Sequence, residues 1–378
     1  MAPHTIYLDN NATTRPHPAV IEEMSRHWGG SFGNPGSRHL PGRRARQVLE
    51  ASRESIAAIL GADPEEVVFT SGGTESNNLA LRGFARRSQG RIALTAAEHP
   101  SVMETFRDLE IRGWTSQILP VDGEGRLTAS APEIAAGAQL VSVILAHNET
   151  GVIQDVSPIA EACQARGIPF HVDAVQAVGK IPVDFHGLGA TSLALGAHKF
   201  HGPRGIGALL LREGAAWTPS FFGGHQEAGR RPGTEPVALI AGMACALELF
   251  NAEQKERQQR LCAWRDRLEQ ALSELCAPVL INGSRDHRLP NTLNVGFPGV
   301  DGEALLIALD LEGIACSLGS TCASGSAEPA PALIAMNRPE SVLRSSVRFS
   351  LGIDNTDDEI VRAGHAIAQT VLRLREGL

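Results

Sequence analysis

Residues 169–176 and 192–202 decide the fold, and they read PFHVDAVQ and SLALGAHKFHG. Each begins with a short apolar run and continues into a polar segment, which is typical of a buried strand followed by a loop. Further apolar runs of this kind lie at 67–69, 91–95, 140–145 and 206–211, with helical stretches between them. This alternation predicts an α/β fold in which helices cover a mostly parallel sheet.

The chain beyond these runs predicts a second unit. Residues 237–275 contain no proline and follow a helical pattern, so we expect long helices that leave the sheet. Further strand or helix candidates lie at 293–297, 303–311 and 347–351. We therefore predict a large domain formed by residues 15–255 and a smaller α+β domain formed by residues 1–14 together with 256–378.

The composition narrows the classes of partner. The formal net charge is −8 and no dense Lys/Arg run occurs, so the chain lacks the basic surface that nucleic acid or an anionic membrane requires. The first residues show no basic segment followed by an apolar one, and no run reaches the roughly 18 apolar residues of a membrane helix. The six cysteines show neither a CxxC pair nor zinc-ligand spacing. We expect a cytoplasmic protein that acts on small molecules or proteins, without a metal site or a disulfide framework.

The polar segments after the strands are candidates for a ligand site, because parallel sheets bind ligands at the carboxyl ends of their strands. Residues 70–77 read TSGGTESN, and glycines together with a helix N-terminus favour a phosphate group. A polar turn in which Ser71 or Thr74 caps the helix explains the same residues. Asn148, after the run 140–145, adds another polar group at a strand end.

Asp173, Gln176 and His99 also follow predicted strands. The carboxylate of Asp173 either caps a helix or, if a pyridine ring lies in the crevice, keeps the ring nitrogen protonated and makes the cofactor an electron sink. Gln176 would then reach the ring hydroxyl. His99 is either structural or a flat ring that stacks on the cofactor and transfers protons.

The chain contains three lysines, and Lys199 is the credible nucleophile among them. A lysine that attacks a carbonyl carbon must first lose its proton, which requires a desolvated or cation-rich pocket. Lys199 lies between His198 and His201, after a predicted strand. Lys255 lies in a charged helical stretch, and we expect Lys180 at the start of a strand, without a catalytic partner.

Cys322 differs from the other cysteines, because its segment GSTCASG is small, flexible and polar. A nucleophilic cysteine needs exposure and room to move, whereas a packing cysteine has apolar neighbours. Cys316, in the segment IAC, is predicted to be such a core residue.

Together these segments resemble the cysteine desulfurases of the NifS/IscS type, within the class V aminotransferase group of pyridoxal-phosphate enzymes. The similarity covers essentially the whole chain, from YLDNNATT at 7–14 and FGNP at 32–35 to RFSLG at 348–352. It implies fold-type I, with the cofactor on the large domain and the catalytic cysteine loop on the small one. It also implies conversion of L-cysteine to L-alanine, with the sulfur carried as a persulfide on Cys322 and delivered to an acceptor protein such as an iron-sulfur scaffold.

The resemblance implies roles for individual residues. Lys199 would bond covalently to pyridoxal 5′-phosphate and move a proton from the substrate Cα, while His99 would stack on the ring and carry a proton. The other cofactor contacts would come from Gly73, Thr74, Asn148, Asp173, Gln176 and His198. The substrate would be held by Arg348, Asn34 and Asn148, with the guanidinium fork on the carboxylate. Thr234, in the segment RPGT, would complete the phosphate site of a partner subunit, which implies a homodimer.

The chain departs from the commoner pattern of this family at a few positions. Gly196 stands where many members have a phosphate-binding serine, so we expect one hydroxyl contact with the cofactor to be missing. Leu318 and Ala323 replace small polar residues near the nucleophile, so we expect the loop to suit a different acceptor or rate.

Three alternatives stay open. A selenocysteine lyase shares the fold and cofactor, and differs in discriminating selenium from sulfur. An aminotransferase or another β-eliminating enzyme of this fold would not depend on Cys322. A catalytically silent partner protein of this fold would be expected to lose the lysine, the acid or the loop cysteine, and the chain retains Lys199, Asp173 and Cys322.

Overall fold

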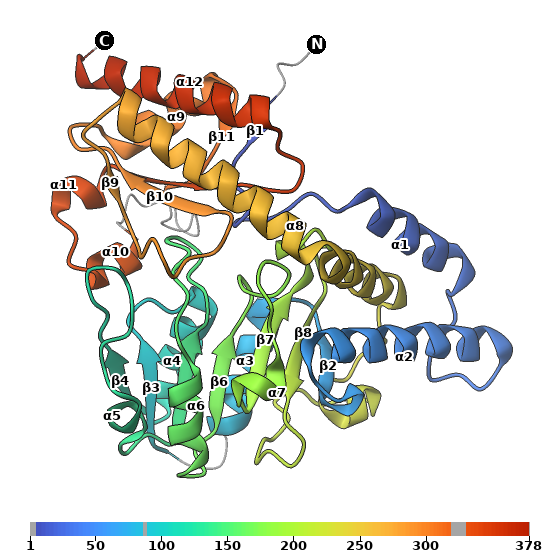
Figure 1. The fold of residues 1–378 in the computed structure, drawn as a ribbon. Coiled ribbons are helices and arrows are strands. Elements are labelled where there is room, and N and C mark those ends of the chain that lie inside the picture. The colour runs from blue at the N-terminus through green and yellow to red at the C-terminus, as the bar shows by residue number, and fades with distance from the viewer. Residues whose placement is uncertain (1–4, 86–88, 319–329, 378) are drawn as a thin grey trace.

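The computed structural model describes residues 5–85, 89–318 and 330–377, and its largest element is a seven-stranded sheet of order β2-β8-β7-β6-β5-β3-β4 (Figure 1). The strands are β2 (Val67–Thr70), β3 (Arg91–Thr95), β4 (Thr115–Leu119), β5 (Leu140–Ile144), β6 (Phe170–Asp173), β7 (Ser192–Gly196) and β8 (Gly207–Leu211). Strands β3 to β7 pair in parallel, whereas β8 runs antiparallel to both β2 and β7. The prediction of an α/β fold with a mostly parallel sheet is confirmed.

Helices cover both faces of this sheet. Strands β5, β7 and β8 bury every residue, as strands covered on both sides must. Val67 and Phe69 of β2 belong to the core beneath one face, which also contains residues of α1, α2 and α5 to α8, while Val68 joins α3 and α4 on the other. These elements are α1 (Pro18–Gly30), α2 (Leu40–Leu60), η1 (Pro64–Glu66), α3 (Gly73–Ala85), α4 (Pro100–Ile111), α5 (Ala131–Ala135), α6 (Ser157–Gln164), α7 (Phe185–Leu188), η2 (Ala197–Lys199), η3 (Gln226–Gly229) and α8 (Val237–Leu275).

A second unit lies above the large sheet in Figure 1 and combines the beginning and the end of the chain. It contains an antiparallel sheet of order β12-β10-β9 and the parallel pair β1-β11. Its core gathers around Leu268, Phe297 and Phe349. The elements of this part are β1 (Ile6–Tyr7), β9 (Leu280–Ile281), β10 (Thr292–Gly296), α9 (Gly302–Leu311), β11 (Ile314–Ala315), α10 (Pro331–Ala335), α11 (Glu340–Leu343), β12 (Ser346–Ser350) and α12 (Asp357–Arg375).

The single helix α8 joins the two units, where the sequence predicts several long helices. Met243 and Leu247 belong to the core under the large sheet, and Leu268 and Leu272 belong to the core of the second unit. A stretch of α8 is long and apolar enough to cross a membrane, but 56% of that stretch is buried inside the protein. Burial of this kind is expected of a core helix shared by two units.

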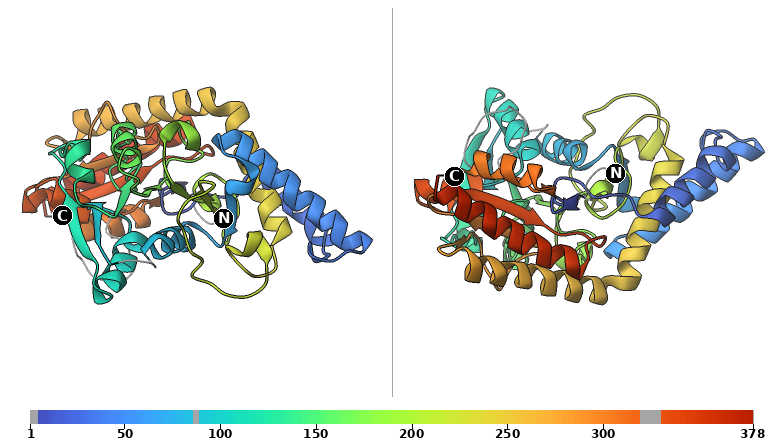
Figure 2. Two further views of the ribbon diagram at one scale, coloured as in Figure 1. Left: turned by 90° about the horizontal axis from the view of Figure 1, so that it is seen from below. Right: turned by 90° about the horizontal axis from the view of Figure 1, so that it is seen from above.

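The apolar runs locate β2, β3, β5 to β8, β10 and β12 to within one or two residues, whereas the short strands β1, β9 and β11 are not predicted. The candidate at 303–311 is the helix α9. The edge strand β4 is not predicted, because it is partly exposed and contains threonine, serine and glutamine instead of an apolar run. Figure 2 shows that α1 and α2 project to one side of the body formed by the two units.

Candidate active site

Asp173 ends strand β6 and lies buried at the carboxyl edge of the sheet, where the sequence predicts it. Its Oδ2 accepts a hydrogen bond from Asn77 Nδ2 at 2.7 Å, and its Oδ1 accepts one from the Val175 N–H at 3.0 Å. Asn77 is fixed in turn by His171, whose Nε2 lies 2.9 Å from Asn77 Oδ1. The sequence analysis assigns no role to Asn77 or His171. Both are polar residues with apolar neighbours in their elements, and this pattern could have indicated that they orient a site residue. The carboxylate is therefore held in one orientation.

Lys199 ends the short turn η2, directly after β7. Its Nζ donates a hydrogen bond to the backbone carbonyl of Asn11 at 2.6 Å. Burial and the positive charge of Arg348 lower the pKa of Lys199 to about 8, against the opposing attraction of Asp173. Its amine therefore loses its proton far more readily than that of a solvated lysine, as a nucleophile requires.

Lys180 is buried beside this site and lies in a turn, so the prediction that it starts a strand is wrong. Its Nζ donates hydrogen bonds to Asn11 Oδ1 at 2.7 Å and to Gln176 Oε1 at 2.5 Å. The backbone N–H of Lys180 bonds to the carbonyl of Ala177 at 3.0 Å, so the chain after β6 turns back and carries the lysine inward. Composition alone does not reveal that turn.

Asn11 joins the two lysines to the second unit. Its backbone carbonyl accepts a hydrogen bond from Gln176 Nε2 at 2.9 Å in addition to the one from Lys199. Its own Nδ2 donates to the Asn148 carbonyl at 3.0 Å and to Thr292 Oγ1 at 2.9 Å. Asn11 therefore lies at the centre of the polar network, although the sequence gives it no individual role.

Arg348 of β12 is buried and reaches the same edge from the second unit. Its Nη2 lies 2.6 Å from Asp9 Oδ1, and its Nη1 donates to the Asn148 carbonyl at 3.1 Å. Its Nε is buried without a hydrogen-bond partner among the described residues. The structure thus brings the predicted substrate residues Arg348 and Asn148 together, with a donor left for a ligand carboxylate.

His99 caps helix α4 at this edge. Its Nδ1 accepts a hydrogen bond from the Ser101 N–H at 3.1 Å, so the neutral ring carries its proton on Nε2. Burial lowers the pKa of His99, Lys199 lowers it further, and Asp173 opposes both. A neutral imidazole held in this way suits stacking and proton exchange at Nε2.

Gly73 and Thr74 form the first turn of α3, whose leading N–H groups have no acceptor within the helix. A side chain at Gly73 would place its Cβ 2.4 Å from Val175 Cγ2, so glycine keeps this approach open. A Cβ at Gly196 would lie 3.3 Å from the Gly73 nitrogen and 3.7 Å from His198 Cδ2. These residues therefore border one space, lined by backbone donors that suit a phosphate.

Two of the described residues that the sequence predicts for the site, Asn34 and Thr234, lie outside this cluster. Asn34 is exposed between α1 and α2, where its Oδ1 accepts a hydrogen bond from the Gly36 N–H at 2.8 Å. Thr234 is exposed between η3 and α8. Cys322 falls outside the described residues. Cys316 packs against the core of the second unit, as predicted, and burial raises its pKa to about 12.

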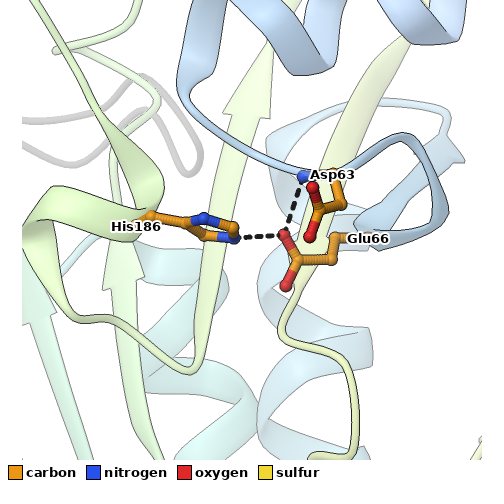
Figure 3. A group of neighbouring side chains, drawn as sticks. All are labelled: Asp63, Glu66 and His186. Atoms are coloured by element: carbon orange, nitrogen blue, oxygen red, sulfur yellow. Dashed lines mark hydrogen bonds and ion pairs between the residues drawn. The ribbon is translucent and has the colours of Figure 1, made fainter.

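A separate group of potential metal ligands, Asp63, Glu66 and His186, lies at the opposite edge of the sheet, near the start of β2 (Figure 3). Glu66 Oε2 accepts hydrogen bonds from His186 Nε2 at 2.7 Å and from the Asp63 N–H at 3.0 Å, and Oε1 accepts one from the Glu213 N–H at 3.1 Å. Both oxygens of the Glu66 carboxylate therefore already accept hydrogen bonds from the protein. We interpret the cluster as a structural tie between η1 and α7.

The donor set at the carboxyl edge fits pyridoxal 5′-phosphate. The fixed carboxylate of Asp173 suits a pyridine nitrogen, and the amine of Lys199, with its lowered pKa, suits an aldehyde carbon. The open start of α3 at Gly73 suits the phosphate. All three parts of the cofactor thus have matching groups on adjacent elements.

Comparison with known proteins finds relatives over almost the whole chain. The family described as aminotransferase class-V matches residues 6–362. A cysteine desulfurase from Trichormus azollae is 43% identical over 98% of this chain and 94% of its own length. Among solved structures, a NifS-like protein has a TM-score of 0.91 and 34% identity, covering 98% of this chain and 100% of its own. A structure of SspA in complex with cysteine has a TM-score of 0.80 and 32% identity, covering 92% of this chain and 99% of its own.

Proposed function

The chain belongs to the aminotransferase class-V family as a cysteine desulfurase, and we propose that it converts L-cysteine to L-alanine with pyridoxal 5′-phosphate bound at Lys199 and the sulfur passed to Cys322. The observation that carries this proposal is the half-buried Lys199, which donates a hydrogen bond to the Asn11 carbonyl and whose pKa is lowered to about 8 at the edge where Asp173 and Arg348 meet. A lysine, an oriented acid and a guanidinium are the groups that amino-acid chemistry on this cofactor needs.

Pyridoxal 5′-phosphate, when bound, supplies an electron sink for the electron pair left on the substrate Cα after deprotonation. Asp173 would pair with the ring nitrogen, and its hydrogen bond from Asn77 supports that orientation. Further contacts would come from residues that border the same edge, with His99 stacked on the ring, Gln176 and Asn148 near its hydroxyl, and Gly73, Thr74 and His198 at the phosphate.

Arg348 would bind the carboxylate of L-cysteine through its guanidinium fork. Its Nε has no hydrogen-bond partner among the described residues, and its Nη1 donates to the Asn148 carbonyl, which supports this assignment. Asn34 is exposed in the connection from α1 to α2, and we propose that the same loop of a second protomer supplies it to the substrate.

Three residues of this chain would handle protons and sulfur. Lys199, once free, would take the proton from the substrate Cα. The Cys322 thiolate would attack the substrate sulfur, so that a sulfur–sulfur bond forms while the bond from Cβ to sulfur breaks and its electron pair stays with carbon. His99 would return a proton through Nε2, and the carbon product would leave as alanine.

The larger assembly is proposed on the same grounds. Thr234 would complete the phosphate site of a second protomer, and its exposure on a surface loop supports such a homodimer. The persulfide would pass to an acceptor protein, such as an iron-sulfur scaffold, in the cytoplasm. We also propose that residues 15–255 act as the cofactor domain and residues 1–14 with 256–378 as the domain that carries the cysteine loop.

The test is an assay of purified protein loaded with pyridoxal 5′-phosphate. L-cysteine should yield alanine and, with a reductant, an equal amount of sulfide, and Lys199→Ala should form neither. Parallel rates with L-selenocysteine separate the selenocysteine lyase alternative, because negligible turnover of L-cysteine beside rapid turnover of L-selenocysteine would reverse the assignment.

A further inference from the structure

Lys180 is a buried lysine to which the proposed reaction gives no task. Its side chain is buried, and the described residues place no carboxylate within ion-pair distance of its Nζ. Burial, together with the positive charges of Lys199 and Arg348, holds the pKa of Lys180 well below its usual range. Burying an amine among other cations is unfavourable, so its presence at this place calls for a reason.

The backbone around Lys180 is built to direct it inward. Gly179 has a φ of 76°, and a Cβ there would lie 2.1 Å from Phe200 Cβ, so this turn requires glycine. The Lys180 N–H bonds to the Ala177 carbonyl at 3.0 Å, and its own carbonyl accepts a hydrogen bond from Gln258 Nε2 at 3.1 Å. The backbone of Lys180 is therefore held at both its N–H and its carbonyl.

The Nζ of Lys180 fixes two side-chain amides at once. A lysine has only donors to offer, so an amide facing it must present its oxygen. Both neighbours do so, because Asn11 Oδ1 lies at 2.7 Å and Gln176 Oε1 lies at 2.5 Å. An amide turned the other way would place its NH2 group against the amine. The two NH2 groups must therefore point elsewhere.

The directions of those NH2 groups matter for the site. Gln176 Nε2 donates to the Asn11 backbone carbonyl at 2.9 Å, and Asn11 Nδ2 donates to the Asn148 carbonyl at 3.0 Å. The same Asn11 carbonyl accepts Lys199 Nζ at 2.6 Å. Lys180 therefore contacts the side chain of the residue whose backbone carbonyl accepts the hydrogen bond from Lys199.

We propose that Lys180 is a positioning residue of the desulfurase site, which orients the amides of Asn11 and Gln176 and through them the amine of Lys199. The proposal rests on the proposed function, because it gives Lys180 its effect through Lys199. A purely structural lysine that joins the N-terminal segment to the sheet would affect folding and leave the geometry of the loaded site unchanged. The two roles therefore differ in what they predict for the folded, loaded protein.

The test compares Lys180→Met with the wild type, both loaded with pyridoxal 5′-phosphate. Methionine has a side chain of similar length, but it lacks the amine that donates the hydrogen bonds to Asn11 and Gln176. We expect kcat for alanine formation to fall at least about tenfold while KM for L-cysteine changes less than about threefold, because Arg348 is untouched. We also expect the visible circular dichroism band of the resting, lysine-bound cofactor to lose at least about half its intensity per bound cofactor, since that band reports the geometry around Lys199.

Lys255→Met is the matched control, because Lys255 is exposed on α8. It should leave kcat, KM and the visible band as in the wild type. If Lys180→Met does not fold, Lys180→Gln, which retains an amide donor, replaces it. In this variant kcat and the visible circular dichroism band should also fall, but by less than we predict for Lys180→Met. Wild-type kcat and visible band in a folded Lys180 variant would overturn the positioning role, whereas a wild type that forms no alanine would instead contradict the proposed function.

Discussion

Arg348 Nη2 lies 2.6 Å from Asp9 Oδ1, although 339 positions separate the two residues in the chain. The pair holds the guanidinium at the boundary between the second unit and the carboxyl edge of the sheet. It also occupies only part of the fork, because Nε is buried without a partner among the described residues. A substrate carboxylate at Arg348 is therefore expected to bind next to Asp9 and to depend on the orientation that Asp9 provides.

Replacing Arg348 tests this orientation. Arg348→Lys keeps a positive charge but loses the fork, so KM for L-cysteine should rise at least about tenfold, with a smaller change in kcat. Steady-state alanine formation measures both constants. Arg344→Lys is the control, because Arg344 is exposed and pairs with Glu340. An unchanged KM in Arg348→Lys would show that this arginine does not bind the substrate carboxylate.

The lowered pKa of Lys199 predicts how the apoprotein takes up its cofactor. Below about pH 8 the amine is protonated and cannot attack an aldehyde, and above that pH it is neutral. The rate of pyridoxal 5′-phosphate incorporation, followed by visible absorbance, should therefore rise through a midpoint near pH 8. A rate that increases only above about pH 10, where a solvated lysine loses its proton, would contradict the lowered pKa of Lys199.

The raised pKa of Glu98 predicts that the stability of the protein depends on pH. Glu98 accepts a hydrogen bond from the Ile144 N–H at 2.8 Å, and burial raises its pKa from 4.5 to about 8. Between these values the folded protein retains a proton that the unfolded chain loses, so the contribution of Glu98 to stability falls as pH rises. The slope is at most about 1.4 kcal/mol per pH unit.

Glu98→Gln removes that proton equilibrium. Relative to the wild type, its free energy of unfolding should therefore increase from pH 5.5 to pH 8, a range within the window set by the two pKa values of 4.5 and about 8. Thermal unfolding of both apoproteins at the two pH values measures the difference. A constant difference would mean that Glu98 keeps an ordinary pKa in the folded protein.

The approach to α3 predicts that Gly73 controls cofactor retention. In Gly73→Ala the new Cβ would collide with Val175, so either the side chain or the first turn of α3 must move. The variant should lose pyridoxal 5′-phosphate at least about tenfold faster on dialysis while its far-UV circular dichroism stays unchanged. Gly30→Ala is the control, because a Cβ there would have none of the described residues within 4 Å. Equal retention of pyridoxal 5′-phosphate in the two variants would contradict a phosphate site at the start of α3.

The sequence predicts those parts of the molecule that depend on local pattern. Buried strands such as β5 and β7 are largely apolar, and Asp173 ends one strand while Lys199 follows another, so both lie where the strand ends meet at one edge. The strand β4 escapes prediction because an exposed edge strand needs no apolar run. Fold and principal site residues are therefore visible in short segments.

Relationships between distant segments are not visible in this way. Lys180 reaches Asn11 only because a turn at Gly179 folds the chain back, and the 169 positions between Lys180 and Asn11 leave no periodic signal. Asn77 and His171 are polar in the sequence, but their hydrogen-bonded chain to Asp173 joins segments that are 94 and 96 positions apart. Such contacts follow from tertiary packing, which local propensity does not determine.

The central claim, that Cys322 receives the sulfur of L-cysteine, is tested most directly by mass analysis of the loaded protein after reaction with L-cysteine without reductant. We predict one added sulfur atom on the peptide that contains Cys322 and an equal amount of alanine, with both lost in Cys322→Ala. Cys316→Ala should behave as the wild type, because Cys316 packs against the core of the second unit. Alanine formation at the wild-type rate in Cys322→Ala, or added sulfur on another cysteine, would contradict the claim.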